Sequence, residues 1–417
     1  MKRLECLDGL RGMLAVYVLL GHMAPFAMLP DVVQSLVSHG GAAVDLFFVL
    51  SGLVIVKALD RANRRADAFL IARAARIFPV FLPVFAVSVA LQAWSCGLSD
   101  MPWIGPDNAA QSICVTAWPR TWLPEILAHL TMTHGLFPKA VLPYVWVIFL
   151  GATWSLSTEW QFYVLALLLH AAGPRRLVGV LLGLAVAGAA WRLSAPELWQ
   201  FSRAFLPNKA HFFALGVASL PVVRSEAGGW RQYWAVLAAA VAVCATQGAF
   251  GRLLPPVVWT LCLAVQMRPR AFGLGLAGTL LRSRIAAYLG AISYCVYLVN
   301  EPIHKVLSGA LSGVADGDAV LFTLMWVPAS ILLPIGVSAW LHQRVEVPAL
   351  RWGRSAAARQ GARPDRHGHG WRERPAPASS CPVLLQRRCE DGRDTPGHDD
   401  QAQTVGCADS QRDNRQG

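Results

Sequence analysis

Apolar segments of about 20 residues, the length that a helix needs to cross the hydrocarbon core of a bilayer, recur along this chain. Short segments rich in Arg, Gly and Pro separate them. This pattern predicts an all-α integral membrane protein with about ten transmembrane helices. The expected spans lie near residues 10–29, 40–58, 78–95, 152–171, 177–192, 204–222, 232–248, 253–267, 286–306 and 319–341.

The apolar pattern stops near Arg351. Beyond that residue the chain is rich in Arg, Asp, Gln, Gly and Pro and shows almost no apolar periodicity, which is typical of a disordered segment. We therefore divide the chain into a polytopic membrane domain, residues 1–351, and a disordered cytoplasmic tail, residues 352–417.

Residues 96–151 are interrupted repeatedly by proline, which breaks every helical pattern in this stretch. A long loop with one short amphipathic or re-entrant helix near Glu125–His134 fits the sequence. An additional pair of spans would preserve the same topology, so the sequence leaves both arrangements open.

The charge of the chain agrees with membrane insertion. Hydrophobic residues make up 55% of the sequence, charged residues only 15%, and the formal net charge is +12. About 20 basic residues fall in loops on one side of the expected spans and about seven on the other, which predicts that both termini are cytoplasmic. This asymmetry accounts for the positive charge without nucleic acid as a partner.

The nine Cys residues show no CxxC spacing, so the sequence indicates neither a metal site nor a redox motif. Cys96 and Cys114 fall in the same expected periplasmic loop, where a disulfide is stable. A bridge and two free thiols both remain open.

Ionisable residues inside the spans are costly, at about 2.5–3.5 kcal/mol each, and are therefore functional candidates. At about 1.5 Å per residue, His22, Asp45, Glu159 and the pair Asn300–Glu301 all fall about 8–12 Å below the outer boundary. This predicts one polar layer in which carboxylates set the state of an imidazole that removes a proton from a hydroxyl. The alternative for His22 is a hydrogen bond that only holds two helices together.

Arg11 precedes His22 by eleven residues, which places both on nearly the same helix face, about 16 Å apart. Arg73 and Arg76 lie at the cytoplasmic start of the third span and can face the same entrance. Clustered Arg suits phosphate groups, and a coenzyme A thioester has a phosphate-bearing head and a long arm that can reach toward His22. Alternatively, Arg73 and Arg76 only follow the cytoplasmic bias for basic residues.

These residues stand in motifs that resemble the membrane acyltransferase 3 family. The segment LDGLRGMLAVYVLLGH, Leu7 to His22, resembles the opening of that family, in which ten residues separate an Arg from a His. Further similar segments follow in the family's order. They are GAAVDLFFVLSGLVI at Gly41–Ile55, ARAARIFPVF at Ala72–Phe81, WSLSTEWQFYVL at Trp154–Leu165, ISYCVYLVNEP at Ile292–Pro302 and RVEVPALR at Arg344–Arg351.

The resemblance implies a ten-span protein of the bacterial inner membrane that uses acyl-CoA, commonly acetyl-CoA, to O-acylate a carbohydrate such as a lipopolysaccharide or an exopolysaccharide. It makes His22 the catalytic residue and Glu159 a supporting acid. It also assigns Arg11, Arg73 and Arg76 to the donor, and no metal is implied. With Asp45 from the polar layer, the expected catalytic set is His22, Glu159 and Asp45. The acyl group would be delivered directly or through a separate glycan-assembly protein.

One position departs from the family pattern. Relatives often show YLxHxP where this chain has Tyr297 to Pro302, with Asn300 in place of the His. Asn can form hydrogen bonds but cannot take up a proton, so an acid–base role there is lost or falls to Glu301 or His304.

Two other classes of function remain open at this point. A transporter or flippase for a sugar-containing substrate would share the polar layer, and an inactive scaffold in a glycan-assembly complex would share the fold. Neither explains why one helix face joins Arg11 to His22. If the protein is an acyltransferase, His22 acts either as a general base or as a nucleophile that carries the acyl group.

Overall fold

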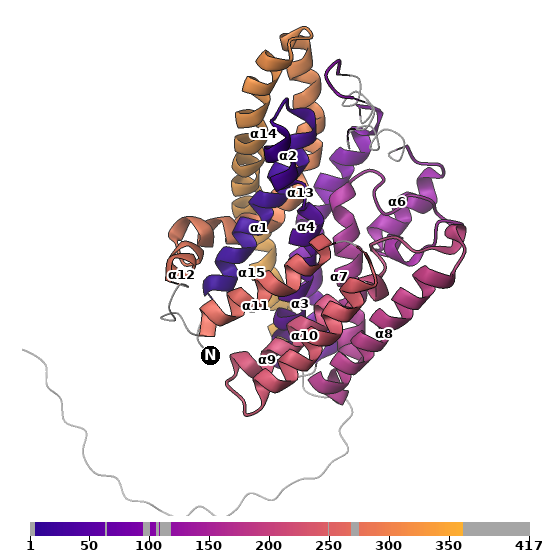
Figure 1. Cartoon of the computed structure of the whole chain (residues 1–417), viewed down its shortest axis with the longest axis vertical. Helices are drawn as coiled ribbons and strands as arrows, with labels where there is room; N and C mark the ends of the chain where they lie inside the picture. Colours follow the sequence, from indigo (N-terminus) through magenta and orange to yellow (C-terminus); the bar gives the residue numbers. More distant parts are fainter. Residues whose placement is uncertain are drawn as a thin grey trace, which may run out of the picture. The chain divides into compact units, whose positions relative to one another are not determined.

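Every expected span overlaps a helix of the computed structural model (Figure 1), which describes residues 5–62, 65–94, 101–105, 108, 118–248, 250–267 and 275–361. Within these residues the chain is helical and contains no named strand. The ten longer helices that match the expected spans are α1 (Glu5–Met23), α3 (Gly40–Arg61), α4 (Ala66–Ala90), α7 (Trp154–Leu168), α8 (Pro174–Ser194), α9 (Ala210–Val223), α10 (Gly229–Ala245), α11 (Leu254–Met267), α13 (Arg284–Ala315) and α14 (Ala319–Leu341).

Several helical segments are long and apolar enough to cross a membrane. Five meet this description by length and composition, while α9 and the segment Gly251–Met267 are shorter apolar helices. The chain is therefore a membrane protein with several apolar helices, and the exact number of spans stays a prediction. The five segments are Glu5–Phe26, Asp31–Arg61, Ala66–Ala90, Pro174–Ser194 and Ala319–Arg359.

Four further helices in the described part of the chain connect or extend this bundle. They are α2 (Asp31–Val37), α6 (Trp122–Leu130), α12 (Gly275–Leu281) and α15 (Val347–Gly361), which a π-helical turn at His342–Glu346 joins to α14. Helix α15 packs against α4 and runs past residue 351, where the sequence pattern places the start of the tail. Residues 362–417 lie outside the described part of the chain.

Close backbone contacts fix two helix pairs. Helix α1 lies along α13, and α3 lies along α9. A Cβ atom at Gly290 of α13 would lie 2.1 Å from the backbone oxygen of Asp8, and one at Gly216 of α9 would lie 1.9 Å from that of Val49. Glycine is required at both positions because any side chain would force the backbones apart.

The proline-rich stretch folds around two buried histidines. Its described part contains one short helix, α6, as the first of the two sequence-based arrangements predicts. The rings of His129 and His134 stack with their centroids 4.3 Å apart, and the His129 ring also stacks on Phe85. Burial lowers the pKa of His134 to about 4, so this imidazole is neutral at physiological pH. The Cys96–Cys114 hypothesis falls on residues outside the described ranges.

The α3–α9 contact generates a first prediction. Gly216→Ala should destabilise the protein by about 1–3 kcal/mol, because the new methyl group meets backbone atoms that cannot rotate away. Gly183→Ala on α8 is the matched control, since a Cβ atom added at Gly183 would have nothing within 4 Å. Thermal stability in detergent, followed by fluorescence-detected size exclusion, measures both. Equal midpoints for the two variants would refute the close contact.

Candidate active site

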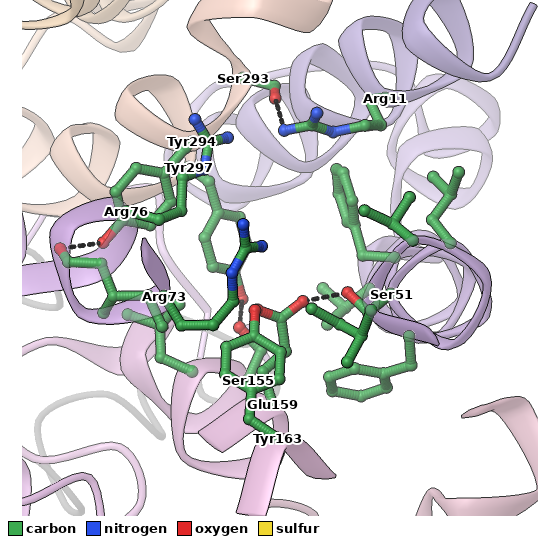
Figure 2. A pocket seen from close by; sticks show the side chains of 18 of the residues that line it. Arg11, Ser51, Arg73, Arg76, Ser155, Glu159, Tyr163, Ser293, Tyr294 and Tyr297 are labelled. Carbon is green, nitrogen blue, oxygen red and sulfur yellow. Dashed lines mark hydrogen bonds between the residues drawn. The ribbon is translucent and has the colours of Figure 1, made fainter. Parts of the chain in front are cut away.

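A cavity of about 340 Å³ lies among helices α1, α3, α4, α7 and α13. Side chains from α3, apolar except for Ser51, form one wall, and most of the side chains from the other helices are polar. Figure 2 shows the guanidinium groups of Arg11, Arg73 and Arg76 approaching the same space. The structure thus brings together the three arginines that the sequence assigns to the donor, although they come from two helices far apart in the sequence.

Each arginine of this cavity is held differently. Arg11 donates a hydrogen bond from Nη2 to Ser293 Oγ at 3.2 Å. Arg76 forms an ion pair with Glu346 and lies over the Tyr294 ring, with 5.4 Å from Cζ to the ring centroid. The Nε atom of Arg73 is buried with no hydrogen-bond partner among the described residues. An unpaired buried donor of this kind is costly, and an anion in the cavity would satisfy it.

Glu159 belongs to this arginine cavity. Its carboxylate accepts hydrogen bonds from Ser51 Oγ and, at 2.8 Å, from Tyr163 Oη, and it interacts electrostatically with Arg11. Ser51 lies six residues beyond Asp45 on α3, about 9 Å further along the helix. Glu159 therefore contacts α3 at a different level from Asp45, so these two carboxylates do not share the one polar layer in which the sequence arithmetic placed them.

His22 lies at the other end of α1 and contacts Asn300. The distance from His22 Nδ1 to Asn300 Oδ1 is 2.6 Å. The Asn300 amide nitrogen donates to the carbonyl oxygens of Val296 and Tyr297, at 2.9 and 2.7 Å, so its oxygen must face the imidazole. Since that oxygen can only accept, neutral His22 carries its proton on Nδ1 and presents an unprotonated Nε2. Asn300 thus orients His22, and this role does not require a side chain that can take up a proton.

The two ends of α1 are tied to the same neighbouring helix, since Ser293 and Asn300 both belong to α13. His22 does not line the arginine cavity. The nearest link is Tyr297, which lines the cavity, accepts a hydrogen bond from Ser155 Oγ at 3.0 Å and lies one helical turn before Asn300. We call the two levels the Arg11 end and the His22 end.

Asp45 and Glu301 form ion pairs with lysine side chains. Asp45 is buried and forms an ion pair with Lys209, with 2.6 Å between Oδ1 and Nζ. Glu301 accepts from the Gly151 amide at 2.7 Å and pairs with Lys305 at 3.3 Å. The His304 ring nitrogen Nε2 lies 3.0 Å from the Ser330 carbonyl oxygen. Among the described residues, neither carboxylate is in hydrogen-bond contact with His22, so a catalytic role of Asp45 stays a prediction.

Sequence reasoning missed two ion-pair partners of the predicted residues. Glu346 contacts Arg76, receives a hydrogen bond from Cys295 Sγ at 3.3 Å and lies 2.7 Å from His342 Nδ1. Its position inside the RVEVPALR segment could have identified Glu346 as a candidate site residue. Lys209 was missed as the partner of Asp45. It could have been found in the sequence as the single basic residue directly before the apolar run of α9.

Comparison with known proteins now adds to this geometry. The model of the acyltransferase 3 family, described as an acyltransferase domain, matches residues 4–343. The chain belongs to the acyltransferase 3 family. The match includes α1, the arginine cavity up to α13 and the Asn300 contact, so the predicted site residues lie within the family domain.

Among curated proteins, the chain is similar to an O-acetyl transferase of Shigella phage Sf6, with 26% identity over 166 residues. The matched region covers 40% of this chain and 45% of the phage protein, less than half of either acyltransferase. No solved structure matches the chain.

The Arg76–Glu346 pair generates a second prediction, tested by a double-mutant cycle. Arg76→Met and Glu346→Leu should each destabilise the protein by leaving a charge unpaired, and the double variant should recover part of that loss. We expect a coupling of about 1–3 kcal/mol from thermal unfolding in detergent. The exposed pair Arg65–Asp67 is the control, with about 0.2–1 kcal/mol expected. Additive effects at Arg76 and Glu346 would show that the pair does not stabilise the fold.

Proposed function

We propose that this acyltransferase 3 family member moves an acyl group, most simply acetyl, from cytosolic acyl-CoA to a hydroxyl of a carbohydrate at the inner membrane. The observation that carries the proposal is α1 itself, which presents Arg11 to a cavity of three guanidinium groups and holds His22 in one tautomer on the same helix. The family match and the O-acetyl transferase relative support acyl transfer.

The cavity suits the phosphates of the donor. Glu346 neutralises Arg76, which leaves the guanidinium groups of Arg11 and Arg73 facing the single carboxylate in the cavity lining, Glu159. The local charge is therefore positive, and Arg73 has a buried donor still to satisfy. A coenzyme A head group bound at the Arg11 end would direct its flexible arm along α1. The thioester would then approach His22 from the cytoplasmic side, and the sugar from the opposite side.

The chemistry at His22 needs an imidazole with one free nitrogen. Acting as a base, Nε2 takes the proton of the acceptor hydroxyl while the oxygen attacks the thioester carbonyl carbon. The carbon–sulfur bond then breaks, and the thiolate that leaves takes the proton back from the imidazolium. Acting as a nucleophile, Nε2 would first form a bond to the thioester carbonyl carbon as the carbon–sulfur bond breaks and the thiolate leaves. The hydroxyl would attack the acyl carbon in a second step, which frees the imidazole, and the hydroxyl proton would pass to the thiolate. Asn300 serves both routes by holding the proton on Nδ1.

The distribution of basic residues supports an orientation for this reaction. About 20 basic residues lie toward the Arg11 end and about seven toward the His22 end, so the donor cavity opens to the cytoplasm in this proposal. Both termini are then cytoplasmic. The acceptor would reach the His22 end from the periplasm, directly or with the help of glycan-assembly proteins.

A transfer assay tests the proposal. Acetyl-CoA labelled in its acetyl group is supplied to inside-out vesicles that contain wild type or His22→Ala, and label is followed into lipid-linked and polymeric glycans. We expect transfer by wild type and about a hundredfold or greater loss in the variant, in line with removal of a catalytic base. His39→Ala is the matched control, because His39 is exposed at the start of α3 near the same end.

Transfer by His22→Ala at the wild-type rate would overturn the assignment of His22. Absence of label with wild type, for acetyl and for longer acyl donors, would instead favour a transporter or a scaffold.

The Asn300 contact generates a further prediction. Asn300→Leu should lower kcat on the order of a hundredfold, because His22 loses the group that fixes its tautomer and orientation. Asn300→Asp should restore activity above that of the Leu variant but move the acid limb of the pH profile to higher pH, since a carboxylate also stabilises the imidazolium. The comparison is made between variants because acid also protonates other buried histidines. Superimposable profiles for wild type and Asn300→Asp would contradict this role.

A further inference from the structure

The His22 end carries a cluster of positive charge that membrane topology does not explain. Basic residues are depleted at this end, with about seven in the sequence, as expected for a periplasmic face. Yet four of them converge. Asp45 interacts electrostatically with Lys209, Arg203 and Arg252, and Arg192 lies near enough to Arg252 to be repelled by it.

The cluster is not neutralised by the acidic residues that contact it. Asp45 is paired with Lys209, which accounts for one cation. Arg252 donates a hydrogen bond to the neutral side chain of Gln247. No ion pair of Arg192, Arg203 or Arg252 is present among the described residues. Three guanidinium groups around one paired carboxylate leave a positive field that would attract an anion.

Arg203 is the member of this cluster best placed to meet a ligand. Its side chain lies in the connection between α8 and α9 and is exposed. The Cζ atom lies 5.0 Å from the ring centroid of Trp146 and 5.6 Å from that of Trp154. Two indole rings thus hold the guanidinium in place while its N–H groups remain available. Trp146 is itself partly exposed, so an apolar platform adjoins the cation.

This platform continues into the wall of the arginine cavity. Trp154 packs edge-on against Phe48, with ring centroids 5.6 Å apart, and the next residue, Ser155, donates a hydrogen bond to Tyr297 Oη at 3.0 Å. Phe48 and Tyr297 both line the cavity, and Tyr297 is a hydrogen-bond neighbour of Asn300. A molecule bound at Arg203 would therefore lie beside the elements that hold His22.

We propose that Arg203, stacked on Trp146 and Trp154, binds an anionic group of the acceptor carbohydrate, so that this enzyme acts on an acidic glycan. The inference rests on the proposed acyl transfer and adds the class of acceptor. The indole faces suit the apolar face of a sugar ring, and the guanidinium suits the planar or tetrahedral oxygens of a carboxylate or a phosphate. The anion belongs either to an acidic sugar or to the diphosphate that links a glycan to its lipid carrier.

Binding without transfer tests the proposal. The full-length protein is placed in phosphatidylcholine nanodiscs, whose lipid has no net charge, and fluorescence polarisation follows three labelled probes. The probes are neutral maltopentaose, a pentameric oligoglucuronate and maltopentaose carrying a terminal diphosphate. Wild type should bind at least one charged probe about tenfold or more tightly than the neutral one, with a preference that weakens as salt is added. Whichever charged probe is preferred identifies the source of the anion.

Variants make the test specific to Arg203. Arg203→Gln should remove most of the preference for the charged probe, and Arg203→Lys should keep part of it because the charge remains. Arg120→Gln is the matched control, an exposed arginine that the sequence places on the same face, and should bind like wild type. Equal binding of neutral and charged probes by wild type would overturn the inference, as would equal effects of the Arg203→Gln and Arg120→Gln substitutions.

The same nanodiscs separate this inference from the proposed function. Hydrolysis or transfer of labelled acetyl-CoA is measured with each probe as acceptor. If wild type transfers label to neutral and charged probes equally, acyl transfer stands and the acidic acceptor is wrong. If charged probes bind at Arg203 but no acyl donor is ever consumed, the anion site stands and the transferase is wrong.

Discussion

The contact between α1 and α13 determines the geometry of the whole site. Gly290 allows the backbones of these helices to approach so closely that no side chain fits between them. Two polar contacts then become possible along the same pair, Arg11 with Ser293 and His22 with Asn300. Because both helices are long and apolar, this pairing keeps a cation and an imidazole about 16 Å apart with no loop between them. The relative positions of Arg11 and His22 are thus set by helix packing.

Buried polar groups inside an apolar bundle need partners, and the carboxylates of this bundle differ in the partners that they have. Asp45, Glu301 and Glu346 are each committed to a basic residue, and the pairs of Asp45 and Glu346 join helices that are distant in the sequence. Glu159 alone among these carboxylates faces the arginine cavity through hydroxyl groups, from Ser51 and Tyr163. A carboxylate held by neutral donors keeps its charge available to the cavity. This difference separates Glu159 from the three carboxylates that are paired with basic residues.

The sequence predicts much of this arrangement and misses the rest for identifiable reasons. Apolar segment length is a strong signal, so each expected span overlaps a helix, and the short helix α6 was expected within the proline-rich stretch. The arginine cavity was predicted because Arg11, Arg73 and Arg76 stand at comparable depth. Depth, however, says nothing about which neighbour a side chain meets. Sequence reasoning therefore put Asp45 and Glu159 in equivalent places in the polar layer. In the structure Asp45 is paired with Lys209, which lies 164 residues away in the sequence.

Asn300 shows why a departure from a family pattern is best judged by its contacts. A residue that cannot titrate is a poor acid or base, but its amide oxygen can still fix the tautomer of the neutral imidazole beside it. A carboxylate at this position would favour the imidazolium, and a second histidine would leave the tautomer undetermined. The Asn300 amide avoids both effects, since its nitrogen is used by the Val296 and Tyr297 carbonyls and its oxygen can only accept. The imidazole at the His22 end is thus held by a neutral group, whereas the guanidinium groups face the cavity at the Arg11 end.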